Sequence, residues 1–267
     1  MTAGEPAIRL GVFLAALVGM AVWEALAPRR PRAFPRAARW PSNLGIVVLD
    51  TLVVRALFPI AAVGVAGFAA ARNWGLFNLT SAPFWLAAAV SIVALDFTIW
   101  AQHILFHRAP WLWRLHRMHH ADLDYDVTTA LRFHPGEIVL SVLIKMAAVL
   151  TLGAPAASVV AFEIVLNALA MFNHANASLP PRVEALARLV FVTPDMHRVH
   201  HSVVPAETNS NFGFNLSIWD RLSGLYRAAP ASGQDGMTIG LPIFRDRREL
   251  RIDRLLTQPW RGDGRAA

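Results

Sequence analysis

Residues 83–107 read PFWLAAAVSIVALDFTIWAQHILFH, and this stretch decides the fold class of the chain. About 20 consecutive apolar residues are enough for a helix to cross the hydrocarbon core of a bilayer, so the stretch predicts a transmembrane helix. The helix would end in two histidines, His103 and His107, which are four residues apart. This spacing places both rings on one side of a helix, a turn apart, at one face of the membrane.

Three further stretches are apolar enough to enter the membrane: residues 8–27, 44–70 and 138–172. The first is not followed by a small-residue cleavage site, so we expect a retained span rather than a signal peptide. One helix over the whole of the third stretch would overshoot the bilayer at 1.5 Å per residue. A hairpin of two short helices that turns at Gly153 and Pro155 fits better.

The composition is that of a membrane protein. Of the 267 residues, 55% are hydrophobic and 16% are charged, whereas soluble domains usually carry about 25% charged residues. We therefore expect an all-α integral membrane protein with about four transmembrane or hairpin helical segments and a cytoplasmic helical cap that carries the histidines. The expected parts are transmembrane helices and loops over 1–82, a histidine-bearing domain over 83–226, and a polar tail over 227–267 that extends from the surface.

Arginines indicate which side is cytoplasmic. The loop after the first span carries five of them: Arg29, Arg30, Arg32, Arg36 and Arg39. The loop after the second span carries Arg72 alone. The positive-inside rule puts the first loop in the cytoplasm, and by alternation the third span also ends there. Because the membrane surface accounts for the net charge of +7, no nucleic-acid partner is expected.

All ten histidines lie between residues 103 and 201, and six of them form the phrase His-Arg-x-His-His twice, at 116–120 and at 197–201. Neutral imidazole is the commonest metal ligand in proteins. The chain has no cysteine, which excludes disulfides, thiolate-bound haem and iron–sulfur clusters. A single zinc ion takes about four ligands, so ten histidines favour a site for two metal ions. Imidazole suits zinc, copper, iron and nickel alike, so the ligand type leaves the metal open.

Three segments carry a family resemblance: HILFHRAPWLWRLHRMHHADLDYDVTTALRFHP (103–135), FNHANASLP (172–180) and TPDMHRVHHSVVPAETNSNFGF (193–214). In this order, between apolar spans, they resemble the fatty acid hydroxylase / sterol desaturase superfamily of integral-membrane di-iron oxygenases. The similarity covers about residues 95–226. It implies iron ligands at His103, His107, His116, His119, His120, His197, His200 and His201, and it extends to His134 and His174, which stand singly between the second and third histidine boxes.

The resemblance also implies the chemistry. Members of the superfamily use O2 at two iron ions to oxidise an unactivated C–H bond of a lipid. Their electrons come from a separate reductase through a ferredoxin or a b-type cytochrome. For this chain we expect a fatty acyl, sterol-like or ether lipid from the bilayer as substrate, with zinc able to substitute for iron. Hydroxylation, desaturation and ether cleavage stay open, and the expected location is the inner membrane of a bacterium.

Acidic residues near the histidines are candidates to orient the rings. A metal-bound imidazole usually donates its second N–H group to a carboxylate or a carbonyl. The candidates are Asp124, Glu137, Asp195 and Glu207. Arg117 and Arg198, inside the repeated phrase, are expected to face lipid phosphates or the electron donor.

Two other functions stay open on the residues alone. A membrane zinc hydrolase acting on a lipid would use bound zinc to activate water, and it would need an open coordination position and a nearby general base. Ten histidines exceed what it needs. A haem-binding or metal-transport protein would place histidines on facing helices inside the bilayer, whereas these cluster at one face.

Overall fold

The computed structural model describes residues 4–262, so the outermost residues of the first and last expected parts, 1–3 and 263–267, lie outside the described residues. Within the described range the regular structure is helical, apart from two isolated β-bridges. Five segments there are long and apolar enough to cross a membrane: Glu5–Leu26, Arg36–Leu79, Phe84–Arg108, Pro135–Leu152 and Ala156–Asn173. The predicted all-helical class is confirmed.

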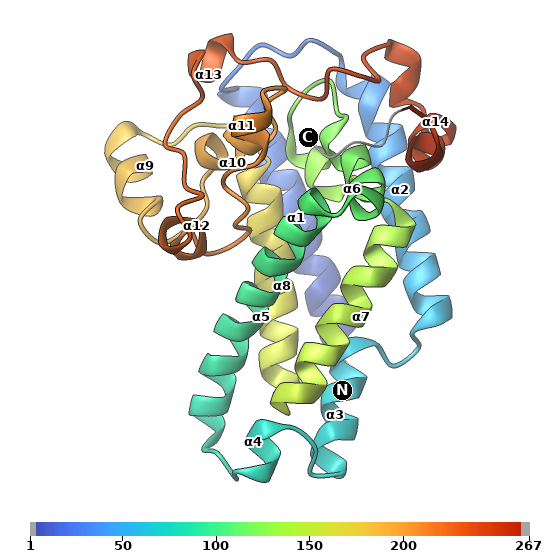
Figure 1. The fold of residues 1–267 in the computed structure, drawn as a ribbon, viewed down its shortest axis with the longest axis vertical. Helices are drawn as coiled ribbons and strands as arrows, with labels where there is room; N and C mark the ends of the chain where they lie inside the picture. Colours follow the sequence, from blue (N-terminus) through green and yellow to red (C-terminus); the bar gives the residue numbers. More distant parts are fainter. Residues whose placement is uncertain (1–3, 263–267) are drawn as a thin grey trace.

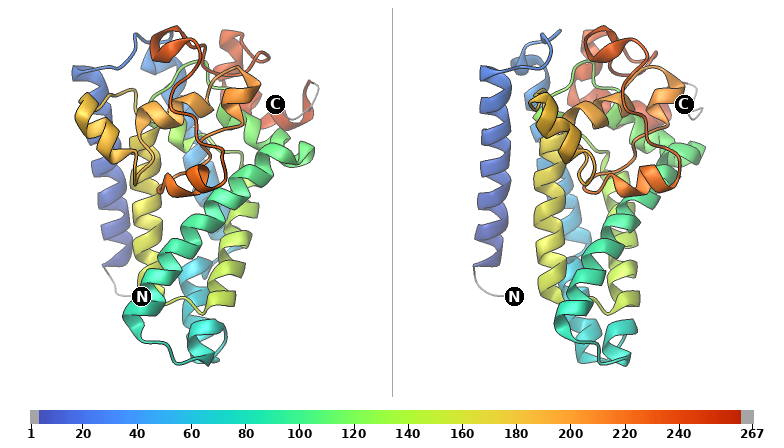
Figure 2. Two further views of the ribbon diagram at one scale, coloured as in Figure 1. Left: turned by 60° about the vertical axis from the view of Figure 1, so that its left-hand side comes forward. Right: turned by 90° about the vertical axis from the view of Figure 1, so that its left-hand side faces the viewer.

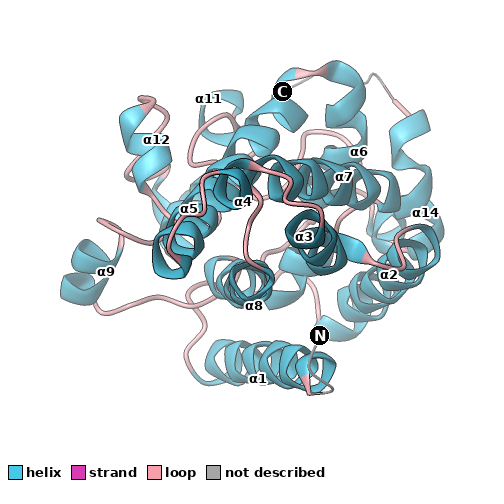
Figure 3. Ribbon diagram, turned by 90° about the horizontal axis from the view of Figure 1, so that it is seen from below, coloured by secondary structure: helices cyan, strands magenta, loops and turns pink. Residues whose placement is uncertain are grey.

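The long helices form a bundle whose axes run roughly vertically in Figure 1. They are α1 (Glu5–Leu26), α2 (Arg36–Leu57), α3 (Ala61–Ala71), α5 (Phe84–Arg108), α7 (Pro135–Leu152) and α8 (Ala156–Asn173). Helix α8 packs against both α1 and α5, and α7 packs against α2, α3 and α5 (Figure 3). Leu95, Val149 and Phe162 are fully buried where α5, α7 and α8 meet.

The predicted hairpin over 138–172 is confirmed. Helices α7 and α8 have 18 residues each, which is about 27 Å at 1.5 Å per residue and close to the thickness of the hydrocarbon core. Gly153 ends α7 with a φ of 65°, a left-handed conformation that suits glycine. Pro155 then precedes the first turn of α8, where its fixed φ prepares the chain for a new helix.

The apolar span expected over 44–70 lies within the longer candidate span Arg36–Leu79, which is made of more than one helix. Helix α2 begins eight residues earlier, at Arg36, and the chain breaks between Leu57 and Ala61 before α3 starts. Pro59 explains the break, because proline has no N–H group to continue the helical hydrogen bonds and its ring clashes with the preceding turn. The short helix α4 (Leu76–Leu79) then leads to α5.

Short helices form a cap on one end of the bundle (Figures 1 and 2). They are α6 (Pro110–His120), η1 (Val127–Leu131), α9 (Pro181–Ala187), α10 (Pro194–His200), α11 (Pro205–Thr208), α12 (Ile218–Leu222), α13 (Gly233–Gly236), η2 (Arg247–Leu250), α14 (Ile252–Thr257) and η3 (Gln258–Trp260). The arginine-rich loop after α1 lies at this end, where the amide of Arg29 donates to the carbonyl of Asn176. Residues 227–262 pack into the cap instead of extending from it, since Met237, Leu241 and Leu255 are buried.

Candidate metal centre

Nine of the ten histidines come together in two adjacent groups of buried side chains. Group 1 consists of His103, His107, His116, His120 and His200, and group 2 consists of His119, His174, His197 and His201. In each group the candidate ligand atoms all lie within 4.8 Å of one another. The groups adjoin, because the rings of His120 and His201 stack with centroids 4.6 Å apart.

Each copy of the repeated phrase supplies both groups. On α6, His116 and His120 enter group 1, whereas His119 crosses to group 2. On α10 the assignment is reversed: His197 and His201 enter group 2, whereas His200 crosses to group 1. In each phrase the histidines stand at positions i, i+3 and i+4. The first and last share one side of the helix, and the histidine at i+3 is rotated from them by part of a turn. The spacing of the phrase therefore divides its three rings between two neighbouring sites.

In group 1 the Nε2 atoms converge. The Nε2 atom of His103 lies 3.1 Å from that of His116 and 3.0 Å from that of His200. The Nε2 atom of His120 lies 3.1 Å from that of His107 and 3.2 Å from that of His116. Five ring nitrogens thus point into one small volume.

Group 2 has the same character. The Nε2 atom of His174 lies 3.1 Å from that of His119 and 3.2 Å from that of His197. His201 completes the group, and neither of its ring nitrogens has a hydrogen-bond partner among the described residues. A buried nitrogen without a partner is costly unless something else binds it.

These spacings fit metal ligation. Two nitrogens at about 2.1 Å from one ion, and at right angles around it, lie about 3.0 Å apart. Burial keeps the rings neutral, which is the form that binds metal. It lowers the pKa of His116 and of His174 to about 3, and it also lowers the pKa of His119 and of His120 well below 6.5, with further lowering from neighbouring histidines.

Hydrogen bonds to the opposite ring nitrogen orient four of the nine rings. The Nδ1 atoms of His103, His174 and His200 each lie 2.8 Å from a backbone carbonyl oxygen, of Phe212, Ala170 and Ser210 respectively. A carbonyl oxygen only accepts, so Nδ1 carries the proton and Nε2 presents its lone pair to the group. His116 does the same with a carboxylate, since its Nδ1 lies 2.6 Å from Oε1 of Glu137.

Asp220 fixes the segment that holds His103, and no sequence pattern indicates this role. Its carboxylate accepts from the amides of Phe212 and Gly213 at 2.9 and 2.8 Å. It also accepts from the indole N–H group of Trp100 on α5, at 3.0 Å. Burial raises the pKa of Asp220 to about 6, and these three donors act against that rise. Asp220 is distant from every histidine in the sequence, so only the folded chain reveals its position.

Of the four predicted orienting carboxylates, Glu137 is the one that contacts a histidine ring within the described residues. The others serve the cap. Asp124 accepts from the amides of Ala33 and Phe34. Asp195 pairs with Arg198, and Glu207 accepts from the amide of Ala231.

His134 lies apart from both groups. Its Nδ1 accepts from the amide of Gly136 at 3.0 Å, so the ring caps the first turn of α7. Its Nε2 lies 3.2 Å from the carbonyl oxygen of Leu256, and an edge-to-face contact joins it to Trp260. Both nitrogens are therefore used in packing the C-terminal segment onto α7.

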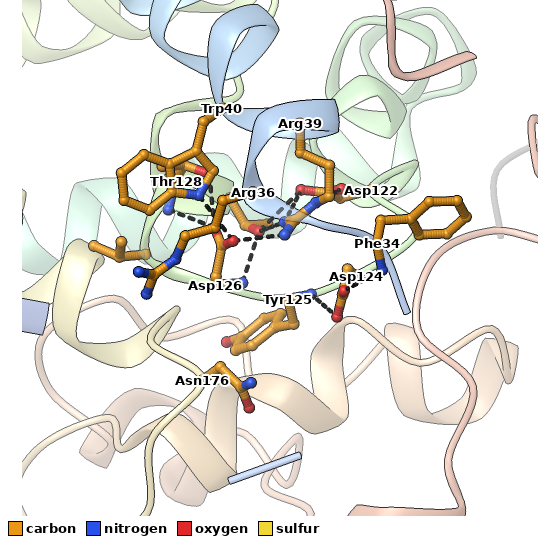
Figure 4. Close-up of polar contacts among 12 residues, drawn as sticks. Phe34, Arg36, Arg39, Trp40, Asp122, Asp124, Tyr125, Asp126, Thr128 and Asn176 are labelled. Carbon is orange, nitrogen blue, oxygen red and sulfur yellow. Dashed lines mark hydrogen bonds and ion pairs between the residues drawn. The ribbon is translucent and has the colours of Figure 1, made fainter. Parts of the chain in front are cut away.

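A buried ionic network fixes the chain immediately after α6 (Figure 4). Arg39 donates to both oxygens of Asp122 at 2.9 and 2.7 Å and to Asp126 at 2.6 Å. All three side chains are fully buried. Burial alone would raise the pKa of Asp122, but Arg39 and Arg132 hold it at about 2. Because Asp122 follows His120 by two residues, this network fixes the end of the helix that carries three candidate ligands.

The expectation that Arg117 and Arg198 face lipid phosphates or an electron donor is wrong. Both side chains are fully buried. Arg117 donates to the carbonyls of Gln258 and Arg261 and thereby attaches the C-terminal segment to α6. Arg198 pairs with Asp195 and also donates to backbone carbonyls after α8. The arginine of each phrase thus anchors its helix within the cap.

A cavity of about 320 Å³ extends from group 1 into the bundle. Its walls come mainly from α2, α5, α7 and α8, and its lining includes His103 and His116 of group 1. The rest of the lining is largely apolar: Val47, Val54, Ile99, Phe106, Leu166 and Phe214. Small-molecule sites occupy about 300–1,000 Å³ and are mostly apolar with a few polar groups, and this cavity matches that description.

The fold and the site define a class: a multi-pass helical protein with a polyhistidine site at one end of its membrane bundle. Comparison with known proteins is consistent with that class. A model of the fatty acid hydroxylase family matches residues 88–225, about half of the chain, and the chain belongs to this family.

Individual relatives are enzymes that act on lipids. Ornithine lipid hydroxylase OlsE of Rhizobium tropici is 32% identical over 148 residues, covering 55% of this chain and 44% of that protein. Human alkylglycerol monooxygenase is 30% identical over 178 residues (65% and 38%), and rat cholesterol 25-hydroxylase is 25% identical over 145 residues (54% and 47%). This chain therefore spans less than half the length of each of these relatives. No solved structure matches the chain.

Proposed function

We propose that this chain is a membrane oxygenase that uses two iron ions, O2 and external electrons to oxidise a C–H bond of a lipid. The observation that carries the proposal is the pair of adjoining histidine groups at the end of a cavity within the membrane bundle. The balanced reaction is R–H + O2 + 2 e⁻ + 2 H⁺ → R–OH + H2O. The electrons would come from a separate reductase through a ferredoxin or a b-type cytochrome.

Group 1 would hold one ion and group 2 the other, with nine histidines as ligands and His134 outside the set. Two iron ions held there would supply the activation of O2 that an unactivated C–H bond requires. The family membership and the neutral, buried rings support iron or a similar ion, and ligand type alone does not distinguish iron from zinc.

The residues of the chain would bind and orient the lipid. Apolar side chains of α2, α5 and α7 line the cavity, so an aliphatic chain can lie there while one carbon is held next to group 1. The same lining excludes water from the reacting carbon. The proton on Nδ1 of His116, held by Glu137, keeps Nε2 directed to the site.

The relatives narrow the expected product. All three are named as hydroxylases or monooxygenases, and they act on an ornithine lipid, alkylglycerols and cholesterol respectively. We expect this chain to insert oxygen into a membrane lipid rather than to desaturate it. We further propose that the cap faces the cytoplasm of a bacterium from the inner membrane, because the arginine-rich loop lies at the same end as the histidines.

The test combines metal content with oxygen incorporation. Protein purified in detergent is analysed for metals, studied by Mössbauer spectroscopy, and then supplied with total bacterial lipid, reductant, reductase and ¹⁸O2. Two coupled irons per chain and ¹⁸O in a lipid product are expected, with no product under nitrogen.

His200→Ala is the variant expected to lose activity, and His134→Ala is its matched control because that ring lies outside both groups. Zinc alone in iron-supplied cells, with lipid hydrolysis that continues without O2, would refute the oxygenase and favour the zinc hydrolase.

A further inference from the structure

Three oxygen atoms inside the cavity have no hydrogen-bond partner among the described residues. They are Oδ1 of Asp50 on α2, Oε1 of Gln102 on α5 and Oε2 of Glu137 on α7. Each can accept a hydrogen bond, and they come from three different helices that wall one cavity. A buried acceptor left without a donor is unfavourable, so such a set is retained where a ligand supplies the donors.

Two of the three residues, Gln102 and Glu137, adjoin residues of group 1. Glu137 holds His116 with its other carboxylate oxygen at 2.6 Å. Gln102 directly precedes His103, and its amide N–H group donates to Ser141 at 2.9 Å. That hydrogen bond turns the carbonyl oxygen of Gln102 away from Ser141 and leaves it unpaired.

Other polar residues of the same cavity are satisfied within the protein. Thr51 donates to the carbonyl of Val47 at 2.7 Å, and Asn167 donates to the carbonyl of Glu163 at 2.9 Å. Lys145 forms an ion pair with Glu163. Polar side chains in membrane helices ordinarily find a partner within the protein, as these three do. The unpaired oxygens of Asp50, Gln102 and Glu137 differ from them in this respect.

Resting on the proposed function, we infer that the substrate is a lipid with hydrogen-bond donors close to the carbon that is oxidised. Hydroxyl, amide N–H or ammonium groups would donate to Asp50, Gln102 and Glu137, and the apolar chain would fill the rest of the cavity. Groups without donors bind poorly there, because they leave the acceptors unpaired. This site selects lipids whose polar group carries hydrogen-bond donors.

The test measures binding separately from oxidation. Four C16 probes are titrated into the metal-loaded protein in mixed micelles: hexadecan-1-ol, hexadecylammonium, 1-methoxyhexadecane and hexadecane-1-sulfonate. Affinity is read from the shift in apparent Tm with probe concentration. The alcohol and the ammonium are expected to bind about tenfold more tightly than the methyl ether, and the sulfonate no better than the ether.

Substitutions locate the selectivity. Gln102→Leu and Asp50→Leu should each reduce the tenfold preference for the alcohol over the methyl ether to about twofold. The matched control is Asn167→Leu, which makes the same kind of change in the same cavity at a side chain that is already satisfied, and it should change both affinities alike. Metal content shows whether Asp50→Leu folds. If it does not fold, the preference for the alcohol over the methyl ether in Gln102→Leu decides the test.

Equal affinity for the alcohol and the methyl ether, tightest binding of the sulfonate, or an unchanged preference in Gln102→Leu would overturn the inference. The proposed function is judged by a different result. Lipid oxidation without any probe preference removes the inference alone, whereas a probe preference without O2-dependent oxidation of any lipid removes the oxygenase alone.

Discussion

Replacing Arg39 by methionine would remove the centre of the buried network that follows α6. The substitution keeps the length of the side chain but leaves Asp122 and Asp126 without the guanidinium that both contact at 2.6–2.9 Å. Water does not reach this place, since both carboxylates are fully buried. The two negative charges would then repel each other in a region of low dielectric constant.

The structure sets the size of the effect. The pKa of Asp122 is lowered from 3.8 to about 2, and at 1.36 kcal/mol per unit this corresponds to about 2–3 kcal/mol, part of which comes from Arg132. Losing the contact with Asp126 increases this loss of stability. Breaking a buried pair by removing one partner usually costs about 3–5 kcal/mol. At about 2–4 °C per kcal/mol, the apparent Tm should fall by about 6–20 °C.

The assay is thermal unfolding in detergent, with metal content measured on the same samples. The control is Arg248→Met, which removes an arginine whose pair with Asp246 is mostly exposed, and it should leave the apparent Tm nearly unchanged. Arg39→Lys keeps the charge but loses the bidentate contact with Asp122. Its apparent Tm should therefore lie between those of Arg39→Met and Arg248→Met. Metal content should drop in Arg39→Met, because the network fixes the end of the helix that carries His116, His119 and His120. An apparent Tm equal to that of the control would show that the network does not hold the cap together.

Three further predictions concern the histidines. His119→Ala should lower metal content at group 2 and His200→Ala at group 1, each by about one ion per chain in elemental analysis; a variant that keeps both ions removes its residue from the ligand set. His134→Ala should keep both ions while losing a helix cap worth about 1 kcal/mol, so a lower Tm with full metal content is expected, and metal loss would return this residue to the ligands. Removing the metal with a chelator should lower the apparent Tm of the unsubstituted protein, because the converging ring nitrogens then lose their partner; an unchanged Tm would contradict the site.

The sequence predicted what depends on local pattern. The apolar run at 83–107 predicted α5, and the sequence LGAP predicted the turn of the hairpin, because glycine and proline limit the backbone there. The concentration of histidines between His103 and His201 predicted one site with room for two ions. The helix and the turn follow from residues that are near one another in the chain, and the metal site follows from a spacing that recurs in two short segments.

Other features depend on contacts between distant residues. Asp220 supports His103 from more than a hundred positions away, and Trp100 donates to it across the same distance. The family resemblance implied that His134 is a ligand, yet the C-terminal segment occupies its Nε2 through the carbonyl of Leu256. Arg117 was expected to face lipid phosphates or an electron donor, but it is buried and donates to carbonyls of the same C-terminal segment. No pattern within a short window contains this information.

The division of each repeated phrase between two groups has a mechanical consequence. Helix α6 contributes to both groups through His116 and His119, and helix α10 contributes to both through His197 and His200. A displacement of either helix therefore changes both sites together, so neither site can be loosened while the other keeps its geometry. Ion pairs fix both helices in the cap. The network after α6 and the pair of the buried Arg198 with Asp195 on α10 hold the two helices on which both groups depend.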